Sequence, residues 1–379
     1  MKILQVNASY KPAYLYGGPT MSVSKLSEEL VKAGCEIEVF TTTANGPDEL
    51  NVSPGEPTDV DGVRVVYFKR LTKDHTHYSP DVLQAMRVHA KHFDVVHIHA
   101  WWNLVSVLAC RAAIKQGVPV VVSPRGTLSN YSFNNRNSLP KTLIHKLLGK
   151  TLLQKSYIHA TSDREAKAME SLIGPKKIFD IPNFVDLPAV MPQVSEGKHK
   201  HLRLLFLSRI DEKKGLELLF HALRDISMSW RLTIAGDGDK EYVNSLKALA
   251  EQNGLTPCIH WIGFQKENKF NVLREHDVLV LPSYDENFGN VVIESLAMGT
   301  AVLVSRNVGL ASYVEQNEFG WVSEQTVGSL ALALYAAWGD GDLRENIREK
   351  APAVVRRDFN EDALAARYID MYKEIIANG

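Results

Sequence analysis

Short β-branched runs that alternate with helical segments are the feature of this chain that most restricts its fold. In the first half of the chain, the runs cover residues 2–7, 36–41, 63–68, 94–99 and 119–122. Helical patterns cover residues 20–33 and 104–116, and Gly34 stands where a helix C-terminus is expected. Strands that alternate with helices are typical of a mostly parallel sheet with helices on both faces.

The same alternation begins again near residue 203. Residues 178–202 contain Pro182, Pro188 and Pro192, show little periodicity, and are expected to form a linker. Because a single core rarely grows beyond about 250–300 residues, a chain of 379 residues fits two domains. We therefore predict an α/β protein with two doubly wound, Rossmann-like domains, residues 1–185 and 186–359, followed by an amphipathic helix over residues 360–376.

The net charge of −1 conceals an asymmetry. Of 43 basic and 44 acidic residues, 22 and 16 lie up to Val185, which leaves 21 and 28 beyond it. A basic first half suggests an anionic partner, such as a membrane surface, a lipid phosphate or a nucleotide; mutual attraction of the two halves is an equally valid interpretation. The three scattered cysteines lack metal-ligand or redox spacing and fit a reducing cytosol. The first residues do not resemble a signal peptide, and no apolar run reaches the ~20 residues of a membrane span.

The segment ENFGNVVIE carries two carboxylates, Glu286 and Glu294, around a loop that leads into a helix. In a strand–loop–helix arrangement, Glu286 lies on the loop and Glu294 about two turns further on, inside the helix. The N–H groups of Phe288, Gly289 and Asn290 would lie at the helix N-terminus, where oxygen-rich or anionic ligands bind. A carboxylate beside such donors can hold sugar hydroxyls, and the second can hold a ribose hydroxyl pair. A charged helix start without a ligand is the alternative interpretation.

Three further loops follow predicted strands. In SRIDEKKG, Arg209 ends a strand and Lys214 opens a helix, an arrangement that suits a diphosphate but also occurs in solvated turns. Gly17 and Gly18 lie between a strand and a helix, where glycines let N–H groups approach phosphate oxygens. The segment 236–238, Gly-Asp-Gly, could contact a nucleotide or form a simple turn. The Asp-Gly-Asp strings lack further oxygen ligands nearby, so no metal site is predicted.

Residues after the strands of the first domain could shape an acceptor pocket. The candidates are His99, Trp101 and Arg125, while His97 is expected to be structural. Because ligands of doubly wound sheets bind outside the carboxyl ends of the strands, the loops of both domains are expected to face one crevice. Residues 139–155 carry an apolar stripe with lysines elsewhere, which fits an ordinary surface helix or a helix at a membrane interface.

Taken in order, these motifs resemble the retaining glycosyltransferases of family four, which have the GT-B fold. The resemblance covers nearly the whole chain and is most specific in its last two-thirds. It also implies that the final helix crosses back to the N-terminal domain. The matching positions are Gly17-Gly18, Arg209 with Lys214, Gly236-Asp237-Gly238, the strand end Trp261-Ile262-Gly263-Phe264, and Glu286 to Glu294.

The resemblance implies a role for each of these positions. Arg209 and Lys214 would hold the donor diphosphate and stabilise the charge that develops on it, so that no metal or cofactor is required. Glu286 would contact the donor sugar and act with Arg209 and Lys214 in catalysis. Glu294 would hold the ribose, and Ile262 would meet the base through its backbone. The other donor contacts would be Gly17, Gly18, Gly236, Asp237, Asn287, Phe288, Gly289 and Asn290.

Two positions depart from the family pattern. Arg125 replaces a histidine that many relatives have, and it is a candidate contact for an anionic acceptor. Residues 307–310 read NVGL instead of the common double glycine, so the donor contact there is left open.

The resemblance predicts a metal-independent, retaining hexosyltransferase. The donor would be a nucleoside-diphosphate sugar, such as a UDP or GDP sugar, and the acceptor a saccharide or lipid-linked saccharide in surface polysaccharide or lipopolysaccharide synthesis. The protein would be cytoplasmic, with the inner face of the membrane as a candidate location, and would have no nucleic-acid partner. The alternatives are a sugar-nucleotide epimerase of related fold and a non-catalytic saccharide- or nucleotide-binding module.

Overall fold

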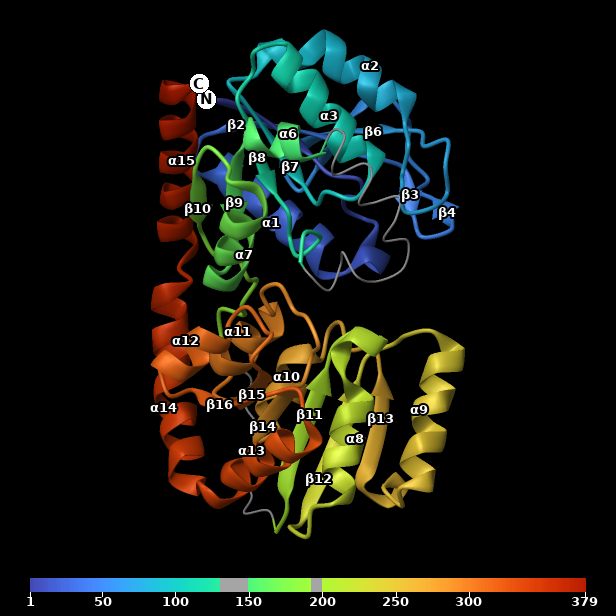
Figure 1. Cartoon of the computed structure of the whole chain (residues 1–379), viewed down its shortest axis with the longest axis vertical. Coiled ribbons are helices and arrows are strands. Elements are labelled where there is room, and N and C mark those ends of the chain that lie inside the picture. The colour runs from blue at the N-terminus through green and yellow to red at the C-terminus, as the bar shows by residue number, and fades with distance from the viewer. Residues whose placement is uncertain (130–148, 192–199) are drawn as a thin grey trace. The chain divides into compact units, whose positions relative to one another are not determined.

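The computed structural model describes residues 1–129, 149–191 and 200–379, and these residues form two compact units (Figure 1). The first unit comprises residues 1–184 and 361–379, and the second comprises residues 185–360. The units divide one residue before the predicted boundary. The last helix, α15 (Glu361–Asn378), belongs to the first unit, where it packs on α1 (Gly18–Lys32) and on a central strand, β7 (Val95–His99).

The described residues of the first unit form an eight-stranded sheet in the order β10-β9-β8-β7-β1-β2-β6-β5. Every neighbouring pair is parallel except β5 and β6, which are antiparallel. The remaining strands of this unit are β1 (Lys2–Val6), β2 (Glu36–Thr42), β3 (Ala44–Asn45), β4 (Asp48–Glu49), β5 (Pro57–Val60), β6 (Val63–Phe68), β8 (Val120–Ser123), β9 (Tyr157–Ala160) and β10 (Ile178–Asp180). Its other helices are α2 (Pro80–His89), α3 (Leu104–Lys115), α6 (Lys150–Gln154) and α7 (Asp163–Ile173), with short 3-10 turns η1 (Tyr14–Tyr16) and η2 (Ala90–His92).

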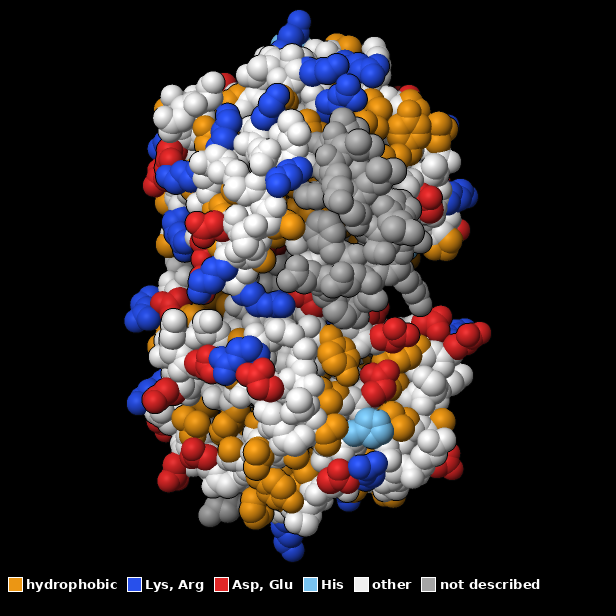
Figure 2. Space-filling view, in the orientation of Figure 1, with side chains coloured by type: hydrophobic (Ala, Val, Ile, Leu, Met, Phe, Trp, Pro, Cys, Tyr) orange, Lys and Arg blue, Asp and Glu red, His pale blue; other side chains and the backbone are white. Residues whose placement is uncertain are grey.

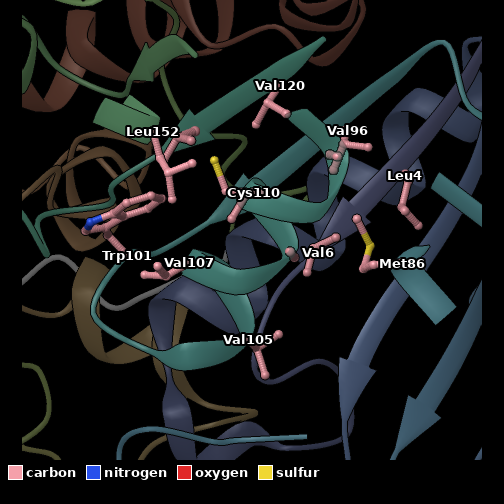
Figure 3. Close-up of a cluster of buried hydrophobic side chains, with 14 of the residues drawn as sticks. Leu4, Val6, Met86, Val96, Trp101, Val105, Val107, Cys110, Val120 and Leu152 are labelled. Carbon is pink, nitrogen blue, oxygen red and sulfur yellow. The ribbon is translucent and has the colours of Figure 1, made fainter. Parts of the chain in front are cut away.

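Strand β1 shows why the sheet needs helices on both faces. Its side chains alternate between the two faces, yet Ile3, Leu4 and Val6 are all completely buried. Leu4 and Val6 belong to a core with residues of α2 and α3, as Figure 3 shows. On the other face, the Gln5 side-chain amide donates to the Tyr372 hydroxyl of α15 at 3.3 Å. The terminal helix is therefore part of the packing of the first sheet.

The second unit contains a six-stranded, wholly parallel sheet in the order β13-β12-β11-β14-β15-β16. Its strands are β11 (Leu202–Leu207), β12 (Trp230–Ala235), β13 (Ile259–Gly263), β14 (Val278–Leu281), β15 (Ala301–Ser305) and β16 (Gly320–Ser323). Its helices are α8 (Leu216–Arg224), α9 (Lys240–Gln252), α10 (Lys269–Arg274), α11 (Asn290–Ala297), α12 (Ala311–Gln316), α13 (Val327–Gly339) and α14 (Gly341–Asp358), with 3-10 turns η4 (Glu212–Lys214) and η5 (Thr256–Cys258). The chain builds outward from β11 in one direction and from β14 in the other, so the strand order reverses between these two neighbours.

Two sequence expectations need correction. The segment 178–202 is not all linker, because Ile178–Asp180 pairs with β9 as the edge strand β10. No strand was predicted between residues 41 and 63, yet this segment contains the β3–β4 hairpin and strand β5. These strands are short or polar and form through pairing with neighbours, which local pattern does not show. Of the helix expected over residues 139–155, residues 139–148 lie outside the described residues, and α6 covers the end.

Charge is distributed unevenly over the face shown in Figure 2. Lys and Arg side chains gather over the first unit, while Asp and Glu side chains are frequent on the second. Among the described residues, none of the helices is both long enough and apolar enough to cross a membrane.

Candidate functional site

Two loops meet at the point where the strand order of the second sheet reverses. Lys214, at the end of η4, follows β11, and Glu286 follows the neighbouring strand β14. The Lys214 ammonium donates a hydrogen bond to Glu286 Oε2, and the two side chains are only 14 % and 21 % exposed. Switch points of parallel sheets are where doubly wound proteins bind ligands. The structure therefore brings together two of the three predicted catalytic side chains.

A second ion pair joins the same two loops. Lys213 Nζ lies 3.1 Å from Asp285 Oδ2, and Asp285 is almost completely buried. The Tyr284 N–H also donates to the Lys213 carbonyl oxygen at 2.8 Å. Neither Lys213 nor Asp285 was predicted from the sequence, although each is the chain neighbour of a residue that was. These contacts fix the loops that carry Lys214 and Glu286.

Two glycines allow the backbones at this edge to approach closely. A Cβ atom at Gly215 would overlap the carbonyl oxygen of Pro282, and one at Gly236 would overlap that of Ser208. The Ile210 N–H donates to the Asp237 carbonyl oxygen at 2.8 Å, which ties the loop after β11 to the loop after β12. The predicted Gly-Asp-Gly segment therefore lies beside the segment that carries Arg209.

Helix α11 begins beside Glu286. Gly289 occupies its N-cap position with φ 91°, and the amide groups of the first turn lie at the carboxyl end of β14. Phe288 is buried, and its ring makes an edge contact with Phe359 at 6.2 Å between centroids. The Glu286 backbone is fixed by the loop after β15, since Gly309 N donates to the Glu286 carbonyl oxygen at 2.8 Å. The side chain of Phe288 thus anchors the loop, while the helix N-terminus provides a place for an anion.

The other predicted residues of the second unit are Arg209, which follows β11, Glu294, which lies within α11, and Ile262, which lies near the end of β13. The Arg209 side chain is 63 % exposed, and its Nη2 lies 3.9 Å from Asp211 Oδ2, so the guanidinium is accessible to a ligand. Glu294, on α11, pairs with Lys269 of α10 at 2.9 Å. Lys269 was not predicted; its position at the start of an expected helix after β13 was the available signal. The Ile262 carbonyl oxygen accepts a hydrogen bond from the Gln265 side chain at 2.7 Å.

The Asp-Gly-Asp strings serve as helix caps. Asp239 accepts hydrogen bonds from the first turn of α9, and Asp340 accepts one from Leu343 at the start of α14. Among the described residues, no group of three or more His, Cys, Asp or Glu side chains is arranged to hold a metal ion.

In the first unit, the glycine loop lies between β1 and α1. Gly17 is the N-cap residue of α1, Gly18 is its first residue, and both are exposed. A Cβ atom at either position would have no atom within 4 Å. The 15-residue helix α1 therefore presents an open, exposed N-terminus that an oxyanion can approach.

The acceptor-side candidates His99 and Trp101 lie inside the first unit. Both are 0 % exposed, and Figure 3 shows Trp101 packed in the core near Leu152 and Val107. His99 Nδ1 accepts a hydrogen bond from Arg125 Nε at 3.1 Å, so Nε2 carries the proton and donates to Gln5 Oε1 at 2.5 Å. This geometry favours a structural role for His99 and Trp101, as the sequence predicted for His97.

His97 connects the sheet to the terminal helix. Its ring nitrogens lie 2.6 Å from the Tyr372 hydroxyl and 2.6 Å from the Ser123 hydroxyl, which in turn lies 2.6 Å from His159 Nδ1. Complete burial, followed by the charge of Arg125, lowers the pKa of His159 to about 3. Burial likewise holds the pKa of His97 and His99 well below the ordinary value, so the three histidines are neutral at physiological pH.

Arg125 is the cation of this cluster. It has a positive φ of 51°, and its Nη1 donates to the Asn183 side chain at 2.8 Å. Its Nη2 is buried and has no hydrogen-bond partner among the described residues. Arg125 is half-buried, and this donor has no partner in the described part of the chain, so its role as a contact for an anionic group stays a prediction.

Comparison with known proteins decides the family. The family model for "Glycosyltransferase Family 4" matches residues 16–188, and the model for "Glycosyl transferases group 1" matches residues 191–354. The chain belongs to the family-four glycosyltransferases. A D-inositol 3-phosphate glycosyltransferase from Jonesia denitrificans is 26 % identical over 94 % of this chain and 91 % of its own length.

Solved structures show that this glycosyltransferase has the GT-B fold. A sucrose-phosphate synthase from Thermosynechococcus elongatus matches with a TM-score of 0.79 and 20 % identity, covering all of both chains. Alr3699/HepE from Anabaena, in complex with UDP and glucose, matches with a TM-score of 0.74 and 17 % identity over 99 % of this chain and 100 % of its own. The predicted architecture of two Rossmann-like domains is confirmed.

Proposed function

We propose that this glycosyltransferase moves a hexosyl group from a nucleoside-diphosphate sugar to a saccharide or lipid-linked saccharide, with retention of configuration and without a metal. The ion pair between Lys214 and Glu286 carries the proposal, because it sets a cation and a carboxylate side by side at the switch point of the sheet. A diphosphate needs the first group and sugar hydroxyls need the second. The epimerase and the non-catalytic module lack a comparable observation in their favour.

Each residue would contribute to a transfer in which the bond from C1 of the hexose to the diphosphate breaks and a bond to an acceptor hydroxyl forms. Arg209, which is exposed, and Lys214 would bind the diphosphate and stabilise the charge it gains as it leaves. Glu286 would bind the hexose beside the N-terminus of α11. Glu294 would bind the ribose, and its ion pair with Lys269 would hold the carboxylate in place.

The donor and acceptor assignments rest on different observations. Because the Anabaena structure contains UDP and glucose, a uridine nucleotide is the first donor nucleotide to test. The excess of basic residues in the first half supports an anionic acceptor or a lipid phosphate, with the protein working in the cytoplasm or at the inner face of a membrane. With a lipid-linked saccharide as the acceptor, the enzyme would act in surface polysaccharide synthesis.

The first experiment is a thermal-shift screen of the purified protein in EDTA with UDP, GDP, ADP and their common sugar conjugates. A ligand that binds only the folded state raises the melting temperature by mass action. We expect one nucleotide family to give a clear shift without metal. No shift with any nucleotide would contradict metal-independent donor binding.

Two variants and a control then test the residue assignment. Lys214→Ala and Glu286→Ala should each lower kcat by about 100-fold or more, because an electrostatic group aimed at developing charge typically contributes about 3 kcal/mol. Lys213→Ala removes the neighbouring ion pair that joins the same loops and should lower kcat far less. Equal losses in all three variants would show that the pairs only hold the loops together.

The stereochemistry and the reaction class need product analysis. Proton NMR of the product from an α-linked donor should show an α-linked hexose, and a β-linked product would contradict retention. A donor isomer formed without any acceptor would instead identify an epimerase.

A further inference from the structure

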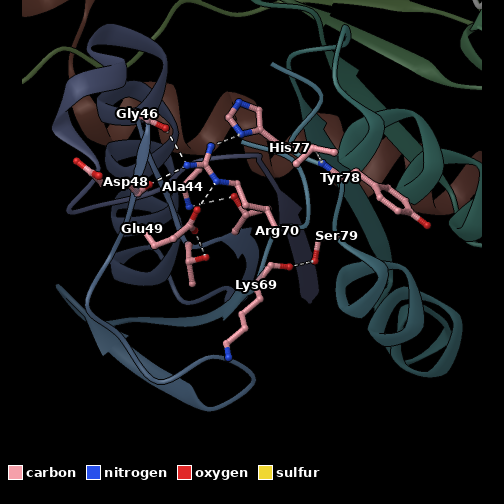
Figure 4. A network of polar contacts seen from close by, with 12 residues as sticks. Ala44, Gly46, Asp48, Glu49, Lys69, Arg70, His77, Tyr78 and Ser79 are labelled. Carbon is pink, nitrogen blue, oxygen red and sulfur yellow. Dashed lines mark hydrogen bonds and ion pairs between the residues drawn. The ribbon is translucent and has the colours of Figure 1, made fainter. Parts of the chain in front are cut away.

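Arg70 is a buried cation that lies outside the residues assigned to donor or acceptor. It follows β6, its side chain is 0 % exposed, and its Nε lies 2.7 Å from Glu49 Oε1 in the β3–β4 hairpin. Its Nη2 donates to the carbonyl oxygens of Gly46 at 2.8 Å and Asp48 at 2.7 Å, as Figure 4 shows. One guanidinium therefore binds the hairpin through its turn and through its second strand.

Arg70 also contacts His77, which lies in the segment before α2. Arg70 Nη1 and His77 Nδ1 are 3.5 Å apart. Burial, followed by the charge of Arg70, lowers the pKa of His77 to about 4. The ring is therefore neutral at physiological pH and can face the guanidinium without charge repulsion.

The hairpin and His77 converge on one side chain, Tyr16. The Gly46 N–H donates to the Tyr16 hydroxyl at 3.0 Å. The rings of Tyr16 and His77 make an edge contact at 5.8 Å between centroids. Tyr16 ends η1 and directly precedes Gly17, whose N–H donates to the Tyr14 carbonyl oxygen at 3.0 Å. The contacts thus run from Arg70 to the residue that precedes the glycine loop.

We propose that Arg70 is a positioning residue for the donor: by gripping the β3–β4 hairpin and His77, it fixes Tyr16 and so holds the Gly17–Gly18 loop in the conformation that receives the donor diphosphate. The inference rests on the proposed role of that loop as a phosphate contact. A Cβ atom added at either glycine would meet no atom within 4 Å, so no packed neighbour holds the loop at these positions, and its conformation depends on the residues that flank it. Because the Arg70 side chain is completely buried, it would act on the donor only through these neighbours.

Tyr16→Phe is the sharpest test, because it removes the hydrogen bond to Gly46 and keeps the ring on His77. A single hydrogen bond corresponds to a factor of roughly two to ten, so the donor KM and the Kd for UDP, or for the nucleotide found by the thermal-shift screen, should rise by this factor. The kcat, the acceptor KM and the melting temperature should change little. Tyr78→Phe, which removes a hydroxyl that points away from Arg70 (Figure 4) on the chain neighbour of His77, should leave the donor KM unchanged.

Arg70→Lys tests the clamp itself. A lysine keeps the charge beside Glu49 but lacks the planar fork that reaches both carbonyl oxygens, so the donor KM should rise at least as much as in Tyr16→Phe. In the double variant the two effects should not add, because both remove the same coupling. Additive effects, or an unchanged donor KM in Tyr16→Phe, would overturn the proposal.

A third variant separates this inference from the proposed function. Gly18→Ala adds a side chain in open space at a position without a positive φ, and it should raise the donor KM if the loop contacts the diphosphate. A rise in Gly18→Ala without one in Tyr16→Phe would refute the clamp and leave the donor role of the loop intact. Absence of nucleotide binding by the wild-type protein would refute the proposed function instead.

Discussion

The buried histidine cluster predicts that the first unit loses stability in mild acid. His159 is fully buried, and its pKa falls from 6.5 to about 3 on folding. A histidine whose pKa is lower in the folded chain than in the unfolded chain binds more protons in the unfolded chain. Its contribution to folding stability is therefore fully present above pH 6.5 and is lost as the pH falls toward the folded pKa. The sensitive window is therefore about pH 6.5 to 3.

The magnitude follows from the size of the pKa difference. One pKa unit corresponds to about 1.4 kcal/mol, and pH 5 lies about 1.5 units below the unfolded pKa, so His159 alone should remove about 2 kcal/mol between pH 7 and pH 5. His97 and His99 are shifted in the same direction and should add to the loss. A few kcal/mol is a large fraction of the stability of an ordinary domain.

Hydrogen exchange in urea, read by mass spectrometry at pH 7 and pH 5, can follow peptides of β7 to β9 separately from those of the second unit. The free energy of opening for β7 to β9 should fall by at least about 2 kcal/mol at pH 5. His159→Asn should reduce this pH dependence, whereas His75→Asn, at an exposed position, should not. An opening free energy for β7 to β9 that stays constant between pH 7 and pH 5 would refute the reasoning.

Two further predictions concern packing. Gly236→Ala should destabilise the second unit by about 3 kcal/mol or more, because its Cβ would overlap the Ser208 carbonyl oxygen. At Gly34 an added Cβ has open space, so Gly34→Ala should cost only about 1 kcal/mol. Urea titration measures both losses of stability, and similar losses would contradict the close backbone approach at Gly236. Because Trp101 is a core residue, Trp101→Ala should lower the stability of the first unit by about 3–5 kcal/mol. Trp101→Phe should leave the acceptor KM unchanged, and a large rise in that KM would show that Trp101 belongs to the acceptor site.

The architecture could be predicted from the sequence because its signals are local. Alternating strand and helix patterns, with loops after each strand, indicate parallel sheets and place functional loops at one edge. Arg209, Lys214, Glu286 and the Gly-Asp-Gly segment all follow strand ends, where the pattern predicted them. Strand β5 and the hairpin were missed because they form through pairing and carry weak local signals.

Tertiary structure alone decided which side chains meet. Lys214 and Glu286 are 72 residues apart, and they pair because β11 and β14 are neighbours in the sheet, an order that no local pattern contains. His99 and Trp101 were predicted to contact the acceptor because polar and aromatic residues at strand ends often bind ligands. Burial by elements distant in sequence turned them inward instead, with Gln5 and Arg125 satisfying His99. Local sequence thus determined the elements and their loops, and long-range packing determined the contacts that give the loops their chemistry.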